Sequence, residues 1–175
     1  MKEAIVEFMT THASLPVATV ALATLPILEL RGALPVALLW TDPLPLWKAY
    51  PLAVFGNMIP IPFIIWFLEP ATNFLRRWKL GDRFVEWLFA RTRRKGKNIE
   101  KYEMWGLVMF VAIPLPVTGA WTGSMAGHVF GLKRHKTLLA CFLGVCIAGV
   151  IMSVLSVTAR ELFVKWFGIG GSASA

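Results

Sequence analysis

Charged side chains are scarce in this chain. Only 16% of its 175 residues are Asp, Glu, Lys or Arg, whereas 57% are hydrophobic and the mean hydropathy is +0.63. A water-soluble domain of this size cannot cover so many apolar side chains in one core. The composition therefore predicts an integral membrane protein.

The sequence also lacks the short motifs that carry chemistry. It contains no glycine-rich phosphate loop, nucleophile elbow, zinc-binding spacing or paired catalytic carboxylates. Cys141 and Cys146 lie five apart and would point about 140° away from each other on a helix, as packed thiols do. His128 and His135, seven apart, are expected to share a helix face near a basic segment rather than to bind a metal. We expect no enzymatic activity, no metal and no cofactor.

Acidic residues are few, and the basic residues are unevenly placed. Ten of the eighteen Lys and Arg residues lie in a linker at about 76–101, which contains only three acidic residues. A basic block between long apolar segments is typical of the cytoplasmic side of a membrane, where it faces anionic lipid headgroups. We therefore expect membrane lipids, and not nucleic acid, as the partners of this linker.

Four apolar segments follow one another, at about 15–40, 50–68, 104–132 and 137–158. The second and fourth are long enough to cross a membrane. The first and third are interrupted, and irregular backbone at membrane depth is tolerated only where protein or water satisfies it, so they are predicted to form re-entrant or broken-helix hairpins. The interrupting residues are Pro26, Gly32 and Pro35 in the first segment and Pro114 and Pro116 in the third.

Glycines recur every four residues in the third segment, at Gly119, Gly123, Gly127 and Gly131. If the segment is helical, they stay near one face and clear a groove in which another backbone can lie. This stripe fits either half of a broken helix inside the membrane or a packing face with no ligand.

The two halves of the chain have the same order of features. An offset of 88 residues superposes Pro26 on Pro114, Lys48 on Lys136 and Gly56 on Gly144, without a gap. Each half runs from a broken apolar segment through a polar turn to a clean span. If the basic linker and residues 133–136 are both cytoplasmic, the third segment enters and leaves on the same side.

The predicted fold is therefore an all-α integral membrane protein with two inverted-topology repeats, each a hairpin followed by a transmembrane helix. The whole chain forms one membrane domain: repeat one at about 1–75, starting with an amphipathic segment at 1–12, repeat two at about 102–166, and a disordered tail at 168–175. The alternative is four ordinary spans with kinks.

Two stretches carry a family resemblance. Residues 28–35, Leu-Glu-Leu-Arg-Gly-Ala-Leu-Pro, and residues 113–123, Ile-Pro-Leu-Pro-Val-Thr-Gly-Ala-Trp-Thr-Gly, resemble the bacterial and archaeal family called putative small multi-drug export proteins. The resemblance covers most of the chain and implies a prokaryotic cytoplasmic membrane.

More distantly, the layout looks like that of the DedA superfamily, whose members have two re-entrant hairpins and are associated with translocating lipid-linked phosphates. That resemblance implies an acidic residue in the first hairpin, which Glu29 matches, and arginines in the second. Here the second hairpin has Val117, Thr118 and Thr122, with Arg134 only at its exit.

Glu29 and Arg31 are the ionisable side chains deep in the first apolar segment. A charge at the bilayer centre costs about 2.5–3.5 kcal/mol on insertion scales, so such residues usually face a cavity or a partner. Glu29 is a candidate proton or cation site, and Arg31 a candidate anion clamp. Alternatively, both pair with polar groups of the opposite hairpin and stabilise the fold.

Three further polar residues complete the candidate substrate- or ion-binding set. Asn57 lies in a span kinked by Pro60 and Pro62, where it faces either a pathway or a neighbouring helix. Thr118 and Thr122 bond either to a ligand or to their own helix.

The sequence thus predicts a small polytopic transporter. It would translocate an amphipathic or phosphate-bearing, lipid-linked substrate, or export small amphipathic compounds, with coupling to protons or cations. The other class is a non-transporting membrane scaffold or assembly factor, in which the glycines only pack helices. A chain with two full spans has difficulty enclosing a pathway alone, so a homo-oligomer, at least a dimer, is expected.

Overall fold

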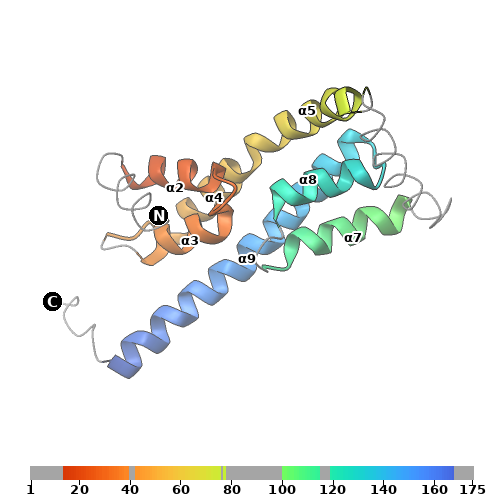
Figure 1. Ribbon diagram of the computed structural model, residues 1–175. Coiled ribbons are helices and arrows are strands. Elements are labelled where there is room, and N and C mark those ends of the chain that lie inside the picture. The colour runs from red at the N-terminus through yellow and green to blue at the C-terminus, as the bar shows by residue number, and fades with distance from the viewer. Residues whose placement is uncertain (1–13, 40–41, 76, 78–99, 115–118, 168–175) are drawn as a thin grey trace. The chain divides into compact units, whose positions relative to one another are not determined.

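The computed structural model describes residues 14–39, 42–75, 77, 100–114 and 119–167, and the regular elements among them are all helices (Figure 1). The all-α prediction is confirmed for this part of the chain. The helices are α2 (Leu15–Thr24), α3 (Glu29–Leu39), α4 (Leu46–Met58), α5 (Pro60–Leu75), α7 (Glu100–Ala112), α8 (Ala120–Val129) and α9 (Arg134–Phe167). The segment at 1–12, Pro116, Thr118, most of the basic linker and the tail at 168–175 lie outside the described residues.

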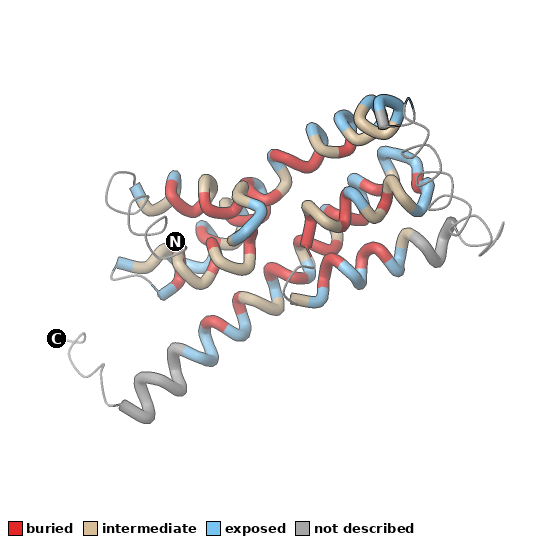
Figure 2. The backbone as a smooth tube through the Cα atoms, in the orientation of Figure 1, coloured by how far each residue is buried: buried red, intermediate tan, exposed pale blue. Residues whose placement is uncertain are grey.

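The first interrupted segment folds as two helices. Pro16 lies in the first turn of α2, where its missing N–H costs nothing, and α2 ends at Thr24, two residues before Pro26. After the connection at 25–28, α3 begins at Glu29 and packs against α2. Each of the two helices has buried residues along its length (Figure 2). Several of the buried residues are small and let the helices approach: Ala18, Ala23, Ala33 and Ala37.

The first long apolar helix is longer than predicted. The helical stretch Leu46–Phe74 has 29 residues and is long and apolar enough to cross a membrane. The prediction that this span begins at residue 50 and closes at Glu69–Pro70 was wrong, because the helix starts directly after Pro45 and continues through Pro70. A proline removes only one hydrogen bond, and residues on either side can continue the helix in apolar surroundings. The predicted interruption lies at Ile59, between α4 and α5.

The second long apolar helix, α9, has 34 residues, of which Arg134–Ala159 is long and apolar enough to cross a membrane. The basic residues 133–136, predicted as a turn, mostly belong to its first turn. Long basic side chains extend from a helix end toward headgroups or water while their backbone stays hydrogen-bonded. The helix likewise passes the predicted end at residue 158, and within the described residues these are the two candidate spans.

The third apolar segment also contains two helices, α7 and α8, which pack against each other. Gly119 precedes α8, while Gly123 and Gly127 lie within it and are buried. Gly131 lies beyond the end of α8 with φ 73°, so it does not extend the stripe but forms the left-handed residue of the following turn.

Gly123 and Gly127 are places where neighbouring side chains reach the α8 backbone. A Cβ at Gly123 would collide with the Val111 side chain, and one at Gly127 would lie 2.7 Å from Thr137 Oγ1 and 3.1 Å from Leu107 Cδ2. Gly123 and Gly127 therefore permit close packing on α8, but the groups that approach them are side chains of α7 and α9 and not, as was predicted, another backbone.

The described helices divide into two compact units. Unit 1 comprises residues 1–56 and 149–175, and unit 2 comprises residues 57–148. The divisions fall at the end of α4 and inside α9, so each long apolar helix contributes to both units.

In unit 1, α2 and α4 approach each other at a glycine. A Cβ on Gly56 would lie 2.5 Å from the carbonyl oxygen of Val20 and 2.9 Å from Cβ of Ala23. Gly56 is therefore required for this contact between α2 and α4.

In unit 2, α7 and α9 approach each other at a matching glycine. A Cβ on Gly144 would lie 2.9 Å from the carbonyl oxygen of Val108 and 2.6 Å from Cβ of Val111. Each of these three residues lies 88 positions after its counterpart in unit 1. The sequence offset thus also relates two sets of backbone contacts.

A hydroxyl compensates for the break after α4. Pro60 has no N–H, so it cannot donate to the carbonyl of Gly56, its helical partner four residues earlier. Instead, the hydroxyl of Thr24 lies 3.1 Å from the Gly56 oxygen and 2.9 Å from the oxygen of Val20 in its own helix. The single hydroxyl proton is shared between the two carbonyls, so α2 supplies the freed Gly56 carbonyl with a bifurcated hydrogen bond.

We expect Thr24→Val to lower stability by roughly 1–3 kcal/mol, because it leaves the Gly56 carbonyl with no donor, whereas Thr24→Ser should stay near wild type. In the double variant Thr24→Val/Pro60→Ala, the restored N–H at position 60 can donate to Gly56, so the loss should be smaller. Melting temperatures in detergent for wild type, Thr24→Val, Pro60→Ala and Thr24→Val/Pro60→Ala test this coupling. Equal losses with and without Pro60 would show that Thr24 acts elsewhere.

Gly123→Leu or Gly127→Leu should disrupt the packing of α8 against α7 and α9. The added carbons enter space that Val111, Leu107 and Thr137 occupy, and overpacking of this kind typically lowers stability by about 1–3 kcal/mol. Gly106→Leu is the control, since a Cβ there meets nothing within 4 Å. Expression and melting temperature in detergent give the comparison. Three variants with wild-type behaviour would contradict the packing role of the stripe.

Candidate functional site

Glu29, the predicted proton or cation site, is the first residue of α3 and follows the connection at 25–28. Only 8% of its surface is exposed, and its φ of 49° is in the left-handed region. Its N–H donates to the Leu25 carbonyl over 2.8 Å, which holds this backbone in place. A buried acid with strained backbone is uncommon, and such residues concentrate at functional sites.

Arg31 lies in the first turn of α3, half-buried and close enough to Glu29 for the two charges to interact. Pro35, inside α3, cannot donate to the Arg31 carbonyl four residues earlier. Gly32 donates to the Leu28 carbonyl over 2.8 Å and continues the turn. A carboxylate, a guanidinium and a carbonyl without its helical donor therefore occur together at the start of α3.

Asn57 is placed in the last turn of α4 and is 3% exposed. Its Oδ1 atom has no hydrogen-bond partner within the described part of the chain. Next along the chain, Pro62 has no N–H to donate to the Met58 carbonyl. The break between α4 and α5 therefore combines a buried amide oxygen with a carbonyl that has lost its helical donor.

The remaining predictions concern Thr122 and the two histidines. The Thr122 hydroxyl donates to the Gly119 carbonyl over 3.3 Å, so it bonds to its own chain segment. His128 and His135 lie on different helices, α8 and α9, and the prediction that they share a helix face was wrong because the chain turns at Gly131. No group of three or more His, Cys, Asp or Glu residues suited to a metal ion occurs among the described residues.

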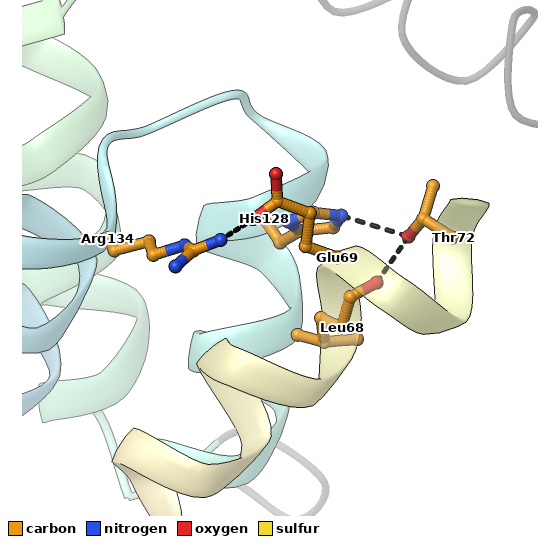
Figure 3. Close-up of polar contacts among 5 residues, drawn as sticks. All are labelled: Leu68, Glu69, Thr72, His128 and Arg134. Carbon is orange, nitrogen blue, oxygen red and sulfur yellow. Dashed lines mark hydrogen bonds and ion pairs between the residues drawn. The ribbon is translucent and has the colours of Figure 1, made fainter.

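Unit 2 contains a polar cluster that the sequence analysis did not find (Figure 3). Glu69 of α5 forms an ion pair with Arg134 at the start of α9. One turn along α5, the Thr72 hydroxyl donates to the Leu68 carbonyl over 2.7 Å and lies 3.0 Å from Nε2 of His128. Glu69 and Thr72 on α5 are far in sequence from their partners Arg134 and His128, and no periodicity or spacing connects the two sides.

Hydrogen bonding indicates how the imidazole is protonated. Because the Thr72 hydroxyl proton is used on the Leu68 carbonyl, Nε2 of His128 is the donor to Thr72. Burial lowers the pKa of His128 below its ordinary value, because desolvation disfavours the charged ring.

An apolar groove adjoins this polar cluster. It has a volume of about 640 Å³ and lies between α5 and α8, which pack against each other within unit 2. It is lined by Phe63, Ile64, Trp66, Phe67, Leu68, Pro70, Trp121 and Met125. We refer to this set as the aromatic groove.

In the part of the chain that the structure describes, the regular elements are helices, and two helical stretches are long and apolar enough to cross a membrane. Residues 29–151 match the model of the family described as "Putative small multi-drug export protein". The match covers well over half of the chain, and the protein belongs to this family. The matched region begins at Glu29 and contains Arg31, Asn57, the polar cluster and the aromatic groove.

No curated protein and no solved structure matches the chain.

Proposed function

We propose that this protein is a small membrane transporter in which Glu29 is the coupling site for a proton or cation. The observation that carries the proposal is the 8% exposure of Glu29 together with its left-handed backbone at the start of α3. A buried carboxylate in apolar surroundings is costly, and membrane proteins use such groups in ion and proton pathways. Family membership supports a membrane exporter in general.

The proposed substrate is amphipathic: a phosphate-bearing, lipid-linked compound or a small amphipathic molecule for export. Arg31 is the proposed contact for an anionic group, since its guanidinium presents a planar fork of donors. At the other end of the first half, Asn57 and the Met58 carbonyl offer acceptors for a cation or a donor group on the substrate.

The proposed architecture is a pair of inverted repeats whose hairpins dip from opposite sides. The matching glycine contacts at offset 88 support an internal repeat. Helix positions support it as well, because α4 begins at Leu46 and α9 begins at Arg134, again 88 residues later. Repeats of opposite orientation would place the two hairpins face to face, as in many secondary transporters.

A dimer is proposed as the functional form. The described residues contain two helices able to cross a membrane, which leaves little protein to enclose a pathway. A monodisperse monomer that transports in vesicles would overturn this part of the proposal.

The second candidate is a membrane scaffold without transport. The close contacts of Gly123 and Gly127 favour it, since helix packing alone explains them. Flux in reconstituted vesicles separates the two candidates.

Glu29→Gln should abolish any dependence of transport on a proton gradient, because it removes the titratable group and preserves the shape. Arg31→Lys should reduce transport of a phosphate-bearing substrate sharply while the protein still folds, because the charge remains but the planar fork is lost. Vesicle flux and melting temperature are measured on both variants and on wild type.

If Glu29 and Arg31 only stabilise the fold, a different pattern of flux and melting temperature is expected. Both single variants would then lose stability in step with activity, and Glu29→Gln/Arg31→Gln would recover part of it because neither charge remains unpaired. Wild-type flux and stability in both single variants would remove Glu29 and Arg31 from the mechanism.

The proposed topology places the linker and residues 133–136 in the same compartment. Single cysteines at Lys97 and Lys136 should therefore be labelled by an impermeant thiol reagent from the same side, the cytoplasmic side. Cys141 and Cys146 are replaced beforehand so that the signal has one source. Labelling from opposite sides would exclude the second hairpin and with it the inverted repeat.

A further inference from the structure

We propose that the aromatic groove binds the acyl chain of an anionic, phosphate-bearing lipid whose headgroup lies at the polar cluster of Glu69 and Arg134. This inference rests on the proposed function and deepens it by choosing one of the two substrate classes and by assigning it a binding site separate from Glu29 and Arg31. It concerns residues that all belong to unit 2.

The groove has the chemistry of a chain-binding site. Its lining consists of apolar side chains, and Phe63, Trp66 and Phe67 on α5 leave about 70% or more of their surface exposed. Its volume of about 640 Å³ falls within the range of roughly 300–1,000 Å³ typical of small-molecule sites. A flexible hydrocarbon chain fills such a groove without leaving a polar group unsatisfied.

Residues that line the groove and residues of the polar cluster are neighbours along both helices. Leu68 and Pro70 line it on α5, and Glu69 lies between them. On α8, Met125 lines it, and His128 follows one helical turn later. The apolar wall therefore leads directly into polar side chains on both helices, as an amphipathic ligand requires.

The basic residues around Arg134 favour a lipid with an anionic headgroup. Glu69 is already paired with Arg134, which lies among Lys133, His135 and Lys136 at the start of α9. The positive end of the α9 dipole lies at the same place. Basic residues near a membrane surface attract anionic headgroups, and an arginine fork holds a phosphate at two oxygens. A cationic amphipath would meet net repulsion there.

The groove assignment is tested with two phenylalanines of one helix. Phe67 lines the groove with 71% of its surface exposed, whereas Phe74 is 60% exposed on the same helix and does not line it. Neither substitution to alanine removes a buried core residue, so both variants should fold. Binding is followed as quenching of tryptophan fluorescence by brominated phosphatidylglycerol in detergent micelles, with Trp66 and Trp121 as reporters in the groove.

Phe67→Ala should raise the half-saturating lipid fraction about tenfold, equivalent to about 1.4 kcal/mol. Phe74→Ala should change it less than about twofold. Met125→Trp fills the groove from α8 and should weaken binding as Phe67→Ala does. Equal effects of Phe67→Ala and Phe74→Ala would overturn the groove as a specific site, because they indicate general contact with lipid.

The assignment of the headgroup to the polar cluster is tested by removing both charges of the Glu69–Arg134 ion pair. Glu69→Gln/Arg134→Gln leaves neither partner uncompensated, so the fold is kept while the arginine fork is lost. Wild type should bind brominated phosphatidylglycerol more tightly than brominated phosphatidylcholine, and this preference should be smaller in the double variant, where only Lys133, His135, Lys136 and the helix dipole remain. A preference for phosphatidylglycerol that is unchanged in the double variant would overturn the assignment of the headgroup to Arg134.

Flux measurements separate this inference from the proposed function. Loss of phospholipid flux in Phe67→Ala and Met125→Trp, with retention in Phe74→Ala, supports the groove as the substrate site. Lipid binding without flux in wild type would overturn transport itself. Normal flux in both groove variants would overturn the groove as the substrate site while transport stands. If the groove variants become monomeric and lipid has no effect, the occupant is a second copy of the chain and the proposal fails.

Discussion

The fold depends on satisfying backbone polar groups where water cannot reach them. The prolines at 35, 60, 62 and 70 each remove one N–H from a helix, and each leaves the carbonyl four residues earlier without its usual donor. At Gly56 the Thr24 hydroxyl supplies the missing donor, and this requires α2 and α4 to approach closely. The glycine at 56 permits the approach, and the proline at 60 makes it necessary. Pro35 and Pro62 likewise remove the helical N–H donors of the Arg31 and Met58 carbonyls, and each of these positions lies within two residues of a candidate residue, Glu29 or Asn57.

Much of the architecture was predictable from the composition and from the prolines that interrupt the apolar segments. Low charge and long apolar segments predicted a helical membrane protein, and Pro26 and Pro114 marked the ends of helices correctly. Two helix boundaries at charged residues were predicted wrongly: the end of α5 was predicted too early, at Glu69–Pro70, and the start of α9 too late, after residues 133–136. A charged side chain ends a span only where its backbone also leaves the helix, and both sites here keep the helical backbone.

The candidate functional residues, too, were only partly predictable from the sequence. Glu29, Arg31 and Asn57 could be identified as candidates from the sequence alone, because an ionisable or amide side chain is unusual inside an apolar segment. Thr72 and His128 are 56 residues apart, and Glu69 and Arg134 are joined by an ion pair between two helices. Partnerships between distant residues depend on how helices pack, and single-sequence patterns do not contain that information. The aromatic groove was missed for the same reason, since its lining comes from two helices separated by the basic linker.

The division of the chain into units has a consequence for biosynthesis. Unit 2 is one continuous stretch, 57–148, whereas unit 1 joins residues 1–56 to 149–175. Gly149 of α9 packs so closely that a Cβ there would lie 2.7 Å from the ring of Tyr50 and 3.4 Å from Leu30. During synthesis, α2, α3 and α4 must therefore wait for the last part of the chain before their packing is complete, because contacts of high sequence separation form late. A ribosome that stops before residue 149 would release a chain with one finished unit and one hairpin lacking its closing helix.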